Sequence, residues 1–255
     1  MPTALALAAH PDDIEFLMSG TLMRLKDAGY EIHYWNLADG CCGSAQTNRE
    51  QTAAIRRAEA IAAAQSIGAI FHESICHDLE IFYDLANLQK VASLLREIAP
   101  RIVLTHAPVD YMEDHTNTCR LAVTAAFTRG MPNFPVQPPR QPCFGEVTVY
   151  HAQPYPNRDP LGQVVRPAYA VNVTALNAQK RVMLACHASQ KQWLDESQGV
   201  DSYLDALTAM AVEVGEMTGV FPQAEGWRKH LHIGFCGPQN DPLAEAMGLQ
   251  GVFLK

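Results

Sequence analysis

Polar residues that follow directly after an apolar segment are the first candidates for chemistry in this chain. His10, Asp12 and Asp13 come after the run Ala4 to Ala9, with Pro11 among them. The apolar run predicts a buried parallel strand, and Pro11 is typical of the first turn of a helix. Open α/β sheets bind ligands at the carboxyl ends of their strands. The N-terminus of a helix also favours the ionised carboxylates that metal ligation and base catalysis require.

A second polar cluster, Asp110 to His115, follows another apolar run, Arg101 to Thr105. Taken singly, each cluster has a simpler interpretation, a helix cap for the first and a surface pair for the second. Taken together, His10, Asp13 and His115 offer two imidazoles and one carboxylate. Such a set suits zinc with a fourth position open for water. The two clusters therefore predict one metal site at the edge of a sheet.

Four motifs occur in a fixed order within residues 3–190. They are Ala9-His10-Pro11-Asp12-Asp13, Arg56-x-x-Glu59, Asp110-Tyr111-x-x-Asp114-His115 and His187-x-Ser189-Gln190. In this order the motifs resemble the PIG-L/LmbE family of zinc-dependent N-deacetylases. The first and third motifs are fairly specific as a pair, whereas the other two are weak alone. The resemblance implies a Rossmann-like fold and hydrolysis of the acetamide on an N-acetylglucosamine-type sugar or conjugate.

The resemblance also implies a role for each residue of the two main motifs. His10, Asp13 and His115 would hold zinc. Asp12 would be the general base, and Asp114 would support the ligands from behind.

One position departs from the family pattern. The family usually has a His three residues before the ligand His, where this chain has Met112. A thioether is at best a weak acceptor, so it cannot polarise a carbonyl group.

The same chemistry follows from what amide hydrolysis needs at neutral pH. The reaction requires an activated water, a site for negative charge on the carbonyl oxygen, and a proton for the leaving amine. Zinc can provide the first two. Asp12 can take a proton from the water and later deliver one to the amine. His187 can replace the missing His if its helix passes over the site; the alternative is a core or helix-end histidine.

Two further residues are candidates for binding the substrate. Arg56, oriented by Glu59 one helical turn away, can reach a hydroxyl, phosphate or carboxylate group; the alternative is a surface ion pair of little energetic value. Tyr111 can donate its hydroxyl to the oxyanion or can pack under its loop. The glycine-containing loop at 39–44 follows the second predicted strand, and its glycines allow close approach to an acetyl group.

The composition indicates an ordinary globular protein. The chain has 255 residues, 48% of them hydrophobic, and a net charge of −8, which disfavours nucleic acids and anionic membranes as partners. No segment is apolar and long enough to span a bilayer, and no basic segment precedes a hydrophobic one at the N-terminus. We therefore expect a cytoplasmic protein with seven reduced cysteines. The expected partner is a small N-acetylated molecule, and the oligomeric state, a homo-oligomer included, is left open.

The predicted elements alternate between strand and helix. Strands are expected at 3–9, 31–38, 69–75, 101–106, 146–151 and 168–173, and helices near 15–29, 48–67, 84–98, 114–129, 175–188 and 200–215. This alternation predicts an α/β, Rossmann-like fold with a mostly parallel sheet and helices on both faces. His230 and His232 alternate in an apolar segment and predict a further strand with both imidazoles on one face.

The chain is expected to form a single domain. Its core would comprise about residues 1–130, and a loop with a small C-terminal cap would comprise about 131–255. Five prolines between Met131 and Gly145 exclude regular structure at the start of that second part.

Two other function classes remain open. A nucleotide-binding Rossmann protein is disfavoured, because no Gly-x-Gly-x-x-Gly follows the first strand and the acids there would repel a pyrophosphate. A catalytically degenerate sugar- or metal-binding protein of the same fold is the second alternative, and Met112 is the argument for it.

Overall fold

The computed structural model describes residues 1–198 and 203–254. Its strands are β1 (Thr3–Ala8), β2 (Glu31–Asn36), β3 (Ile70–His72), β4 (Ile102–Thr105), β5 (Thr148–Ala152), β6 (Tyr169–Asn172), β7 (Ala224–Lys229) and β8 (Gly251–Phe253). Its helices are α1 (Asp13–Leu17), α2 (Ser19–Asp27), α3 (Arg49–Ser66), α4 (Leu85–Ile98), α5 (Glu113–Thr128), α6 (Asn177–Ala185), α7 (Ala188–Gln198), α8 (Tyr203–Thr218) and α9 (Pro242–Met247), with 3₁₀ turns η1 (Thr174–Leu176) and η2 (Gly248–Gln250).

The strands form one sheet with the order β3-β2-β1-β4-β5-β7-β6-β8. The first five strands of this order are parallel, while β7 pairs antiparallel with both β5 and β6, and β8 pairs antiparallel with β6. Parallel pairing brings the carboxyl ends of β1, β2 and β4 to one edge of the sheet. Each predicted site motif follows one of these strands, except the motif in the late helix. The predicted mostly parallel α/β fold is confirmed.

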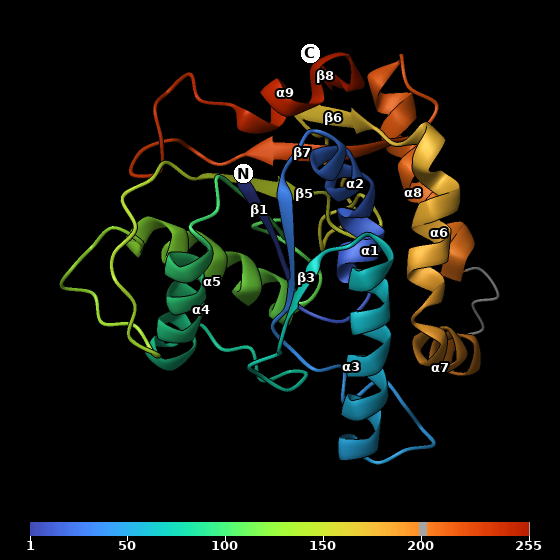
Figure 1. Cartoon of the computed structure of the whole chain (residues 1–255). Helices are drawn as coiled ribbons and strands as arrows, with labels where there is room; N and C mark the ends of the chain where they lie inside the picture. The colour runs from blue at the N-terminus through green and yellow to red at the C-terminus, as the bar shows by residue number, and fades with distance from the viewer. Residues whose placement is uncertain (199–202, 255) are drawn as a thin grey trace.

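Helices cover both faces of the sheet (Figure 1). Ala4, Ala6 and Ala8 of β1 pack in one hydrophobic cluster with residues of α1, α2 and α3, and Leu5 and Leu7 pack in the other with residues of α4 and α5. This division follows from the alternation of side chains along a strand. β1 is therefore buried on both sides, as its apolar run predicts, and its end is a rigid platform for the residues that follow.

The helix predicted at 15–29 is interrupted. Met18 separates α1 from α2 with a non-helical φ of −136°. The Ser19 hydroxyl donates to the Glu15 carbonyl across the break at 2.7 Å, and the backbone N–H groups of Gly20 and Thr21 are bound by the Glu225 carboxylate instead of by the preceding turn. A partner more than 200 residues away therefore sets this break, and the local pattern could not predict it.

The C-terminal part of the chain joins the same sheet. Residues after the proline-rich segment, in which no helix or strand forms between Thr128 and Thr148, add β5 to β8. The strand predicted around His230 and His232 is wrong, because β7 ends at Lys229 and both histidines follow it. Of the helix predicted at 200–215, residues 200–202 lie outside the described residues; the described part begins at Tyr203. No helix in the described ranges is long and apolar enough to cross a membrane.

Candidate metal centre and active site

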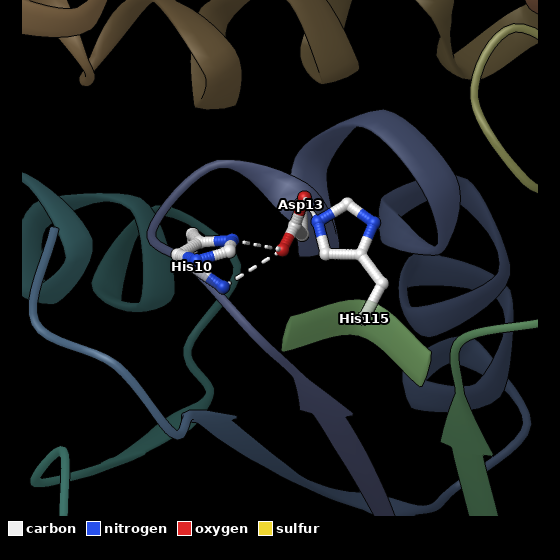
Figure 2. A group of neighbouring side chains, drawn as sticks. All are labelled: His10, Asp13 and His115. Atoms are coloured by element: carbon white, nitrogen blue, oxygen red, sulfur yellow. Dashed lines mark hydrogen bonds and ion pairs between the residues drawn. The ribbon is translucent and has the colours of Figure 1, made fainter. Parts of the chain in front are cut away.

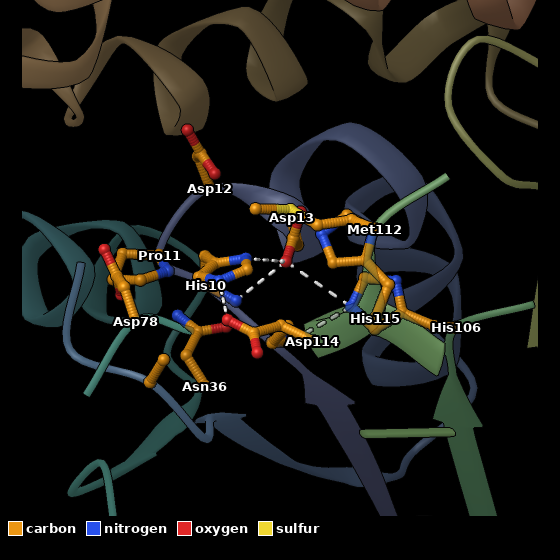
Figure 3. A network of polar contacts seen from close by, with 12 residues as sticks. His10, Pro11, Asp12, Asp13, Asn36, Asp78, His106, Met112, Asp114 and His115 are labelled. Atoms are coloured by element: carbon orange, nitrogen blue, oxygen red, sulfur yellow. Dashed lines mark hydrogen bonds and ion pairs between the residues drawn. The ribbon is translucent and has the colours of Figure 1, made fainter. Parts of the chain in front are cut away.

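The turn after β1 carries the first motif. Asp13 begins α1 and its carboxylate accepts the backbone N–H of His10 at 2.7 Å, which closes the turn. Asp12 lies between them with a left-handed φ of 101°, a conformation that is costly for a residue other than glycine. This backbone directs the side chains of Asp12 and Asp13 in different directions, as Figure 3 shows. Two adjacent carboxylates can therefore serve different purposes.

The three predicted metal ligands converge at the edge of the sheet (Figure 2). β1 and β4 are neighbours, so the segment after each strand brings His10 and Asp13 opposite His115. Asp13 lies 3.5 Å from His10 Nδ1 through one carboxylate oxygen and 3.4 Å from His115 Nε2 through the other. One ligand atom from each of the three residues lies within 4.8 Å of the others. This spacing fits a single small cation between them.

A carboxylate holds the outer nitrogen of each of the two histidines. Asp114 lies 2.9 Å from His10 Nε2, and Asp110 lies 3.0 Å from His115 Nδ1. These contacts orient both rings so that the inner nitrogens face Asp13, an arrangement typical of histidines that ligate a metal. Asp114 also accepts the backbone N–H of Leu79 at 2.7 Å, so it supports His10 from a fixed position. Asp110 was part of a predicted motif, but sequence reasoning gave it no role.

The electrostatics of the cluster favour a cation. Burial would lower the pKa of His10, but its hydrogen bonds to Asp114 and Asp13 outweigh burial and raise the pKa to about 10. Burial would raise the pKa of Asp13, but the nearby charge of His115 and the hydrogen bond with His10 hold it well below its usual range. Three carboxylates thus surround two imidazoles, and a divalent ion would replace the proton on His10. The donor set, its outer contacts and its charge all fit a metal ion.

His106 lies next to the metal cluster. Sequence reasoning did not predict it as a ligand. Its Nε2 accepts the backbone N–H of Ala9 at 2.9 Å, and its ring stacks on His115 with centroids 4.1 Å apart. The bond from Ala9 assigns the proton to Nδ1, which has no partner within the described part of the chain. His106 therefore fixes the ring plane of His115 and joins the ends of β1 and β4.

Asp12 is held by two residues away from the metal cluster. The hydroxyl of Tyr203 donates to its carboxylate at 2.6 Å, and Arg56 Nη2 lies 3.5 Å from the same oxygen. Burial raises the pKa of Asp12, while Arg56 and the Tyr203 bond oppose the rise. Tyr203 was missed by sequence reasoning, since it lies 191 residues further along the chain and a tyrosine at the start of a helix carries no local signal.

Arg56 is buried rather than exposed. Its side chain is 1% exposed, its Nη2 donates to the Pro11 carbonyl, and its Nη1 lies 3.9 Å from Glu59. Glu59 in turn accepts the backbone N–H and the hydroxyl of Ser189 at 2.8 and 2.7 Å, which joins the second and fourth motifs. The alternative of a surface ion pair is therefore excluded, and Arg56 acts on Asp12 from α3.

His187 is buried outside the cavity rather than over it. The side chain is fully buried, and its Nε2 is 3.4 Å from a carboxylate oxygen of Glu15, which also accepts the Tyr34 hydroxyl. His187 is not among the residues that line the cavity, although it is near enough for its charge to lower the pKa of Asp12. The reason is that α6 ends before the cavity and turns into α7, which carries the lining residues Gln190 and Trp193 instead.

The metal cluster and Asp12 form the floor of a cavity of about 400 Å³. Tyr111 and Met112 line it, as do Gly40, Cys42 and Gly43 of the predicted glycine loop. Aromatic side chains form its wall: Phe16, Tyr111, Tyr155, Trp193 and Tyr203. Phe16 stands at the centre of this wall, with ring centroids 5.8 Å from Tyr155 and 5.2 Å from Tyr203. The cavity therefore offers a polar floor and a flat, mostly apolar wall.

Comparison with known proteins finds a family model that matches the N-terminal part of this chain. The family described as PIG-L, GlcNAc-PI de-N-acetylase, matches residues 5–126, which confirms the predicted resemblance to the PIG-L/LmbE family. The N,N'-diacetylchitobiose deacetylase of Pyrococcus horikoshii has a similar structure, with a TM-score of 0.76 at 25% identity, covering 91% of this chain and 84% of that one.

Two curated relatives have different activities. Diacetylchitobiose deacetylase of Thermococcus kodakarensis is 28% identical over 136 residues, about half of this chain and half of its own length (51% of each). The 4-oxalmesaconate hydratase of Pseudomonas putida is 28% identical over 197 residues, 74% of each chain. Relatives of this chain thus include both deacetylases and a hydratase, and an enzyme of this fold is indicated.

Proposed function

We propose that this protein is a zinc-dependent hydrolase that removes the acetyl group from an N-acetylglucosamine-type sugar or conjugate, with residues 1–255 acting as one domain. The observation that carries the proposal is that the candidate metal ligands and the candidate base lie side by side in one cavity but are held by different partners. His10, Asp13 and His115 converge as ligands, while Asp12 points elsewhere and is held by its own partners. A water molecule and an acetamide can meet between these two sets.

His10, Asp13 and His115 would hold the zinc, which would supply Lewis acidity to the water and to the acetyl carbonyl. Asp12 accepts a proton from the water as the water oxygen bonds to the carbonyl carbon. The same carboxylic acid then donates this proton to the nitrogen as the carbon–nitrogen bond breaks. Arg56 and Tyr203 fix the position of Asp12, and Asp110 and Asp114 fix the two ligand imidazoles.

Tyr111 is the proposed donor to the carbonyl oxygen. It lines the cavity beside His115, with ring centroids 5.5 Å apart. Burial and the carboxylates of Asp13 and Asp110 raise the pKa of Tyr111, so its hydroxyl stays protonated and can donate. Met112 lines the same cavity but cannot donate a hydrogen bond. We assign His187 to the electrostatic environment of Asp12 rather than to the carbonyl oxygen, since it does not line the cavity.

The cavity wall supports a neutral, ring-shaped substrate. Among the described residues that line the cavity, Arg56 is the one Arg and there is no Lys; its guanidinium is already engaged by Pro11 and Asp12. A pyranose ring has an apolar face that can pack on aromatic side chains such as those of the wall. An N-acetyl sugar places its amide near the polar floor and its ring against this wall.

Hydration of an unsaturated carboxylic acid is the second candidate function, and the match to 4-oxalmesaconate hydratase over 74% of the chain favours it. Asp12 could exchange a proton with carbon in that reaction as well. A substrate with several carboxylates needs cationic partners, however, and the lining residues offer one engaged guanidinium. This scarcity of cationic side chains is why we place deacetylation first.

The test is release of acetate from a panel of N-acetyl sugars and their conjugates by the zinc-loaded protein. Asp12→Asn is the matched control: it should retain zinc and lose roughly 10²-fold or more in turnover. Loss of 4-oxalmesaconate is measured in parallel. Turnover of 4-oxalmesaconate alone would replace the proposal with hydration, and zinc binding without either reaction would favour the non-catalytic alternative.

A further inference from the structure

A second group of potential metal ligands lies beside the cavity, in two loops that the mechanism above leaves unused. The loop after β2 carries Asp39, Cys41 and Cys42, and the loop after β3 carries His77 and Asp78. An isolated parallel bridge between Ala38 and Cys76 continues the pairing of the two strands and brings the loops together. None of these residues belongs to the set formed by His10, Asp13 and His115.

Three different donor types meet in this group. Asp39 Oδ2 lies 2.6 Å from His77 Nδ1, and the sulfur of Cys41 lies within 4.8 Å of ligand atoms of both residues. The sulfur of Cys42 lies 4.0 Å from that of Cys41. An isolated pair between Asp39 and His77 would be an ordinary surface ion pair. The buried Cys41 thiol beside the pair and the second thiol next to it are what distinguish the cluster.

Backbone hydrogen bonds order the cluster, and the Cys41 sulfur also accepts a hydrogen bond from Arg49 Nε at 3.2 Å, which a bound metal would displace. Asp78 accepts the backbone N–H groups of Gly40 and Cys42 at 2.8 and 2.9 Å, and Asp39 Oδ1 accepts the N–H of Cys41 at 3.1 Å. The turn requires a positive φ of 77° at Gly40, where an added Cβ would lie 2.8 Å from Arg56 Nε. Asp39 thereby keeps its other oxygen directed at His77. The side chain of His77 is 53% exposed, so an ion can enter from solvent.

We propose that Asp39, Cys41 and His77 form a second site that binds a thiophilic divalent cation such as Zn²⁺ or Cd²⁺. One thiolate, one imidazole and one carboxylate, with the fourth position open, suit these ions, and the thiolate favours the softer Cd²⁺. The ligand set of the first site contains no sulfur, so the two sites differ in their preference for metals. The proposal does not depend on the reaction that the cavity catalyses.

Binding at the second site would release a proton. Burial raises the pKa of Cys41 to about 11, so at neutral pH the sulfur carries a proton that the metal must displace into solvent. The site also adjoins the cavity, because Cys42 and Asp78 line it. A bound cation would fix this part of the cavity rim.

The experiment is a titration of the metal-free, full-length protein with Cd²⁺, with near-ultraviolet absorbance of the cadmium–thiolate bond and bound cadmium as readouts. The wild type should bind about two equivalents, and only one of them should produce the thiolate absorbance. Cys41→Ser should lose that absorbance and one equivalent. Cys186→Ser, which removes a thiol elsewhere, is the matched control and should retain both. His115→Ala should lose the equivalent without thiolate absorbance.

His77→Gln changes an exposed side chain, so it provides a second test of the site if Cys41→Ser does not fold. It should weaken the thiolate-associated binding by at least about 10-fold, as expected when one of a few ligands is removed. Equal absorbance and stoichiometry in Cys41→Ser and Cys186→Ser, or an unchanged cadmium affinity in His77→Gln, would overturn the proposal.

Discussion

Two buried clusters of charged residues in this molecule differ in how completely their hydrogen bonds are satisfied. In the first, Glu225 of β7 accepts the N–H groups of Gly20 and Thr21, the Thr21 hydroxyl, and the ammonium group of Lys180. Trp227 donates to the same Thr21 hydroxyl at 3.0 Å. No side-chain atom of this cluster is left without a partner. We call it the Glu225 cluster.

The second cluster is the metal centre together with its neighbours His106, Asp12 and Arg56, and its hydrogen bonds remain incomplete. Asp110 Oδ2, His106 Nδ1 and both Nε and Nη1 of Arg56 are buried without a hydrogen-bond partner in the described structure. Asp13, Asp110 and Asp114 also bring three carboxylates to one place. A buried polar group without a partner is costly. The satisfied hydrogen bonds of the Glu225 cluster indicate that it stabilises the fold, whereas the unsatisfied groups of the second cluster are what we expect of a site that binds a ligand.

The largest expected effect is on metal binding. Structural zinc in zinc-finger peptides binds with about 10–16 kcal/mol, and on that scale the loss of one of three protein ligands should cost ~4 kcal/mol, about 10³-fold in affinity. His115→Ala should show this loss by metal analysis and competition with a chelator. Zinc should raise the melting temperature of the wild type but not of His115→Ala. Equal, near-stoichiometric metal in both proteins would remove the ligand assignment.

A substitution in the Glu225 cluster should lower the stability of the fold rather than the affinity for metal. Lys180→Met leaves the Glu225 carboxylate buried without its counter-ion, which should lower the free energy of unfolding by about 3–5 kcal/mol. Chemical denaturation of the metal-free protein measures this change. Zinc affinity of the folded fraction should be unchanged. If Lys180→Met weakened zinc binding as much as His115→Ala does, the functional distinction between the two clusters would be lost.

A smaller effect on zinc affinity is expected from a substitution of Asp110, whose carboxylate contacts the proposed ligand His115. Asp110→Asn keeps the size of the side chain but removes the charge that orients His115, so zinc affinity should fall by about 10- to 100-fold. Competition with a chelator again provides the measurement, with Asp159→Asn in an exposed loop as the control. Unchanged affinity would show that the His115 ring is held by its stacking on His106 alone.

The smallest expected effect is on the pKa of the proposed base, Asp12, rather than on metal binding. The Tyr203 hydroxyl bond opposes the rise in the pKa of Asp12, so Tyr203→Phe should raise that pKa further. The acidic limb of the pH profile of turnover should then move to higher pH by up to about one unit, because Arg56 still faces the same carboxylate. A shift to lower pH, or loss of bound zinc, would contradict the proposed function of Tyr203.

Much of the fold could be predicted from the sequence, for a reason that particular elements illustrate. The run before His10 is apolar without alternation because β1 is covered on both faces. Asn48 caps the N-terminus of α3, and its side chain accepts the N–H of Gln51 in a capping box. Both signals are local. The break at Met18 and the strands β7 and β8 depend on distant partners, and they were not predicted.

The sequence alone determined which residues could act as ligands, because His10, Asp13 and His115 follow strands whose parallel pairing brings their ends to one edge. Only the tertiary structure decided what surrounds them. It places Tyr203 on Asp12 and Asp110 on His115, buries Arg56 and His187, and brings Cys41 to His77. Local sequence patterns indicate which residues of a single helix or strand are buried, through the spacing of its apolar side chains. Contacts between side chains on different elements depend on how those elements pack, and no single segment encodes that packing.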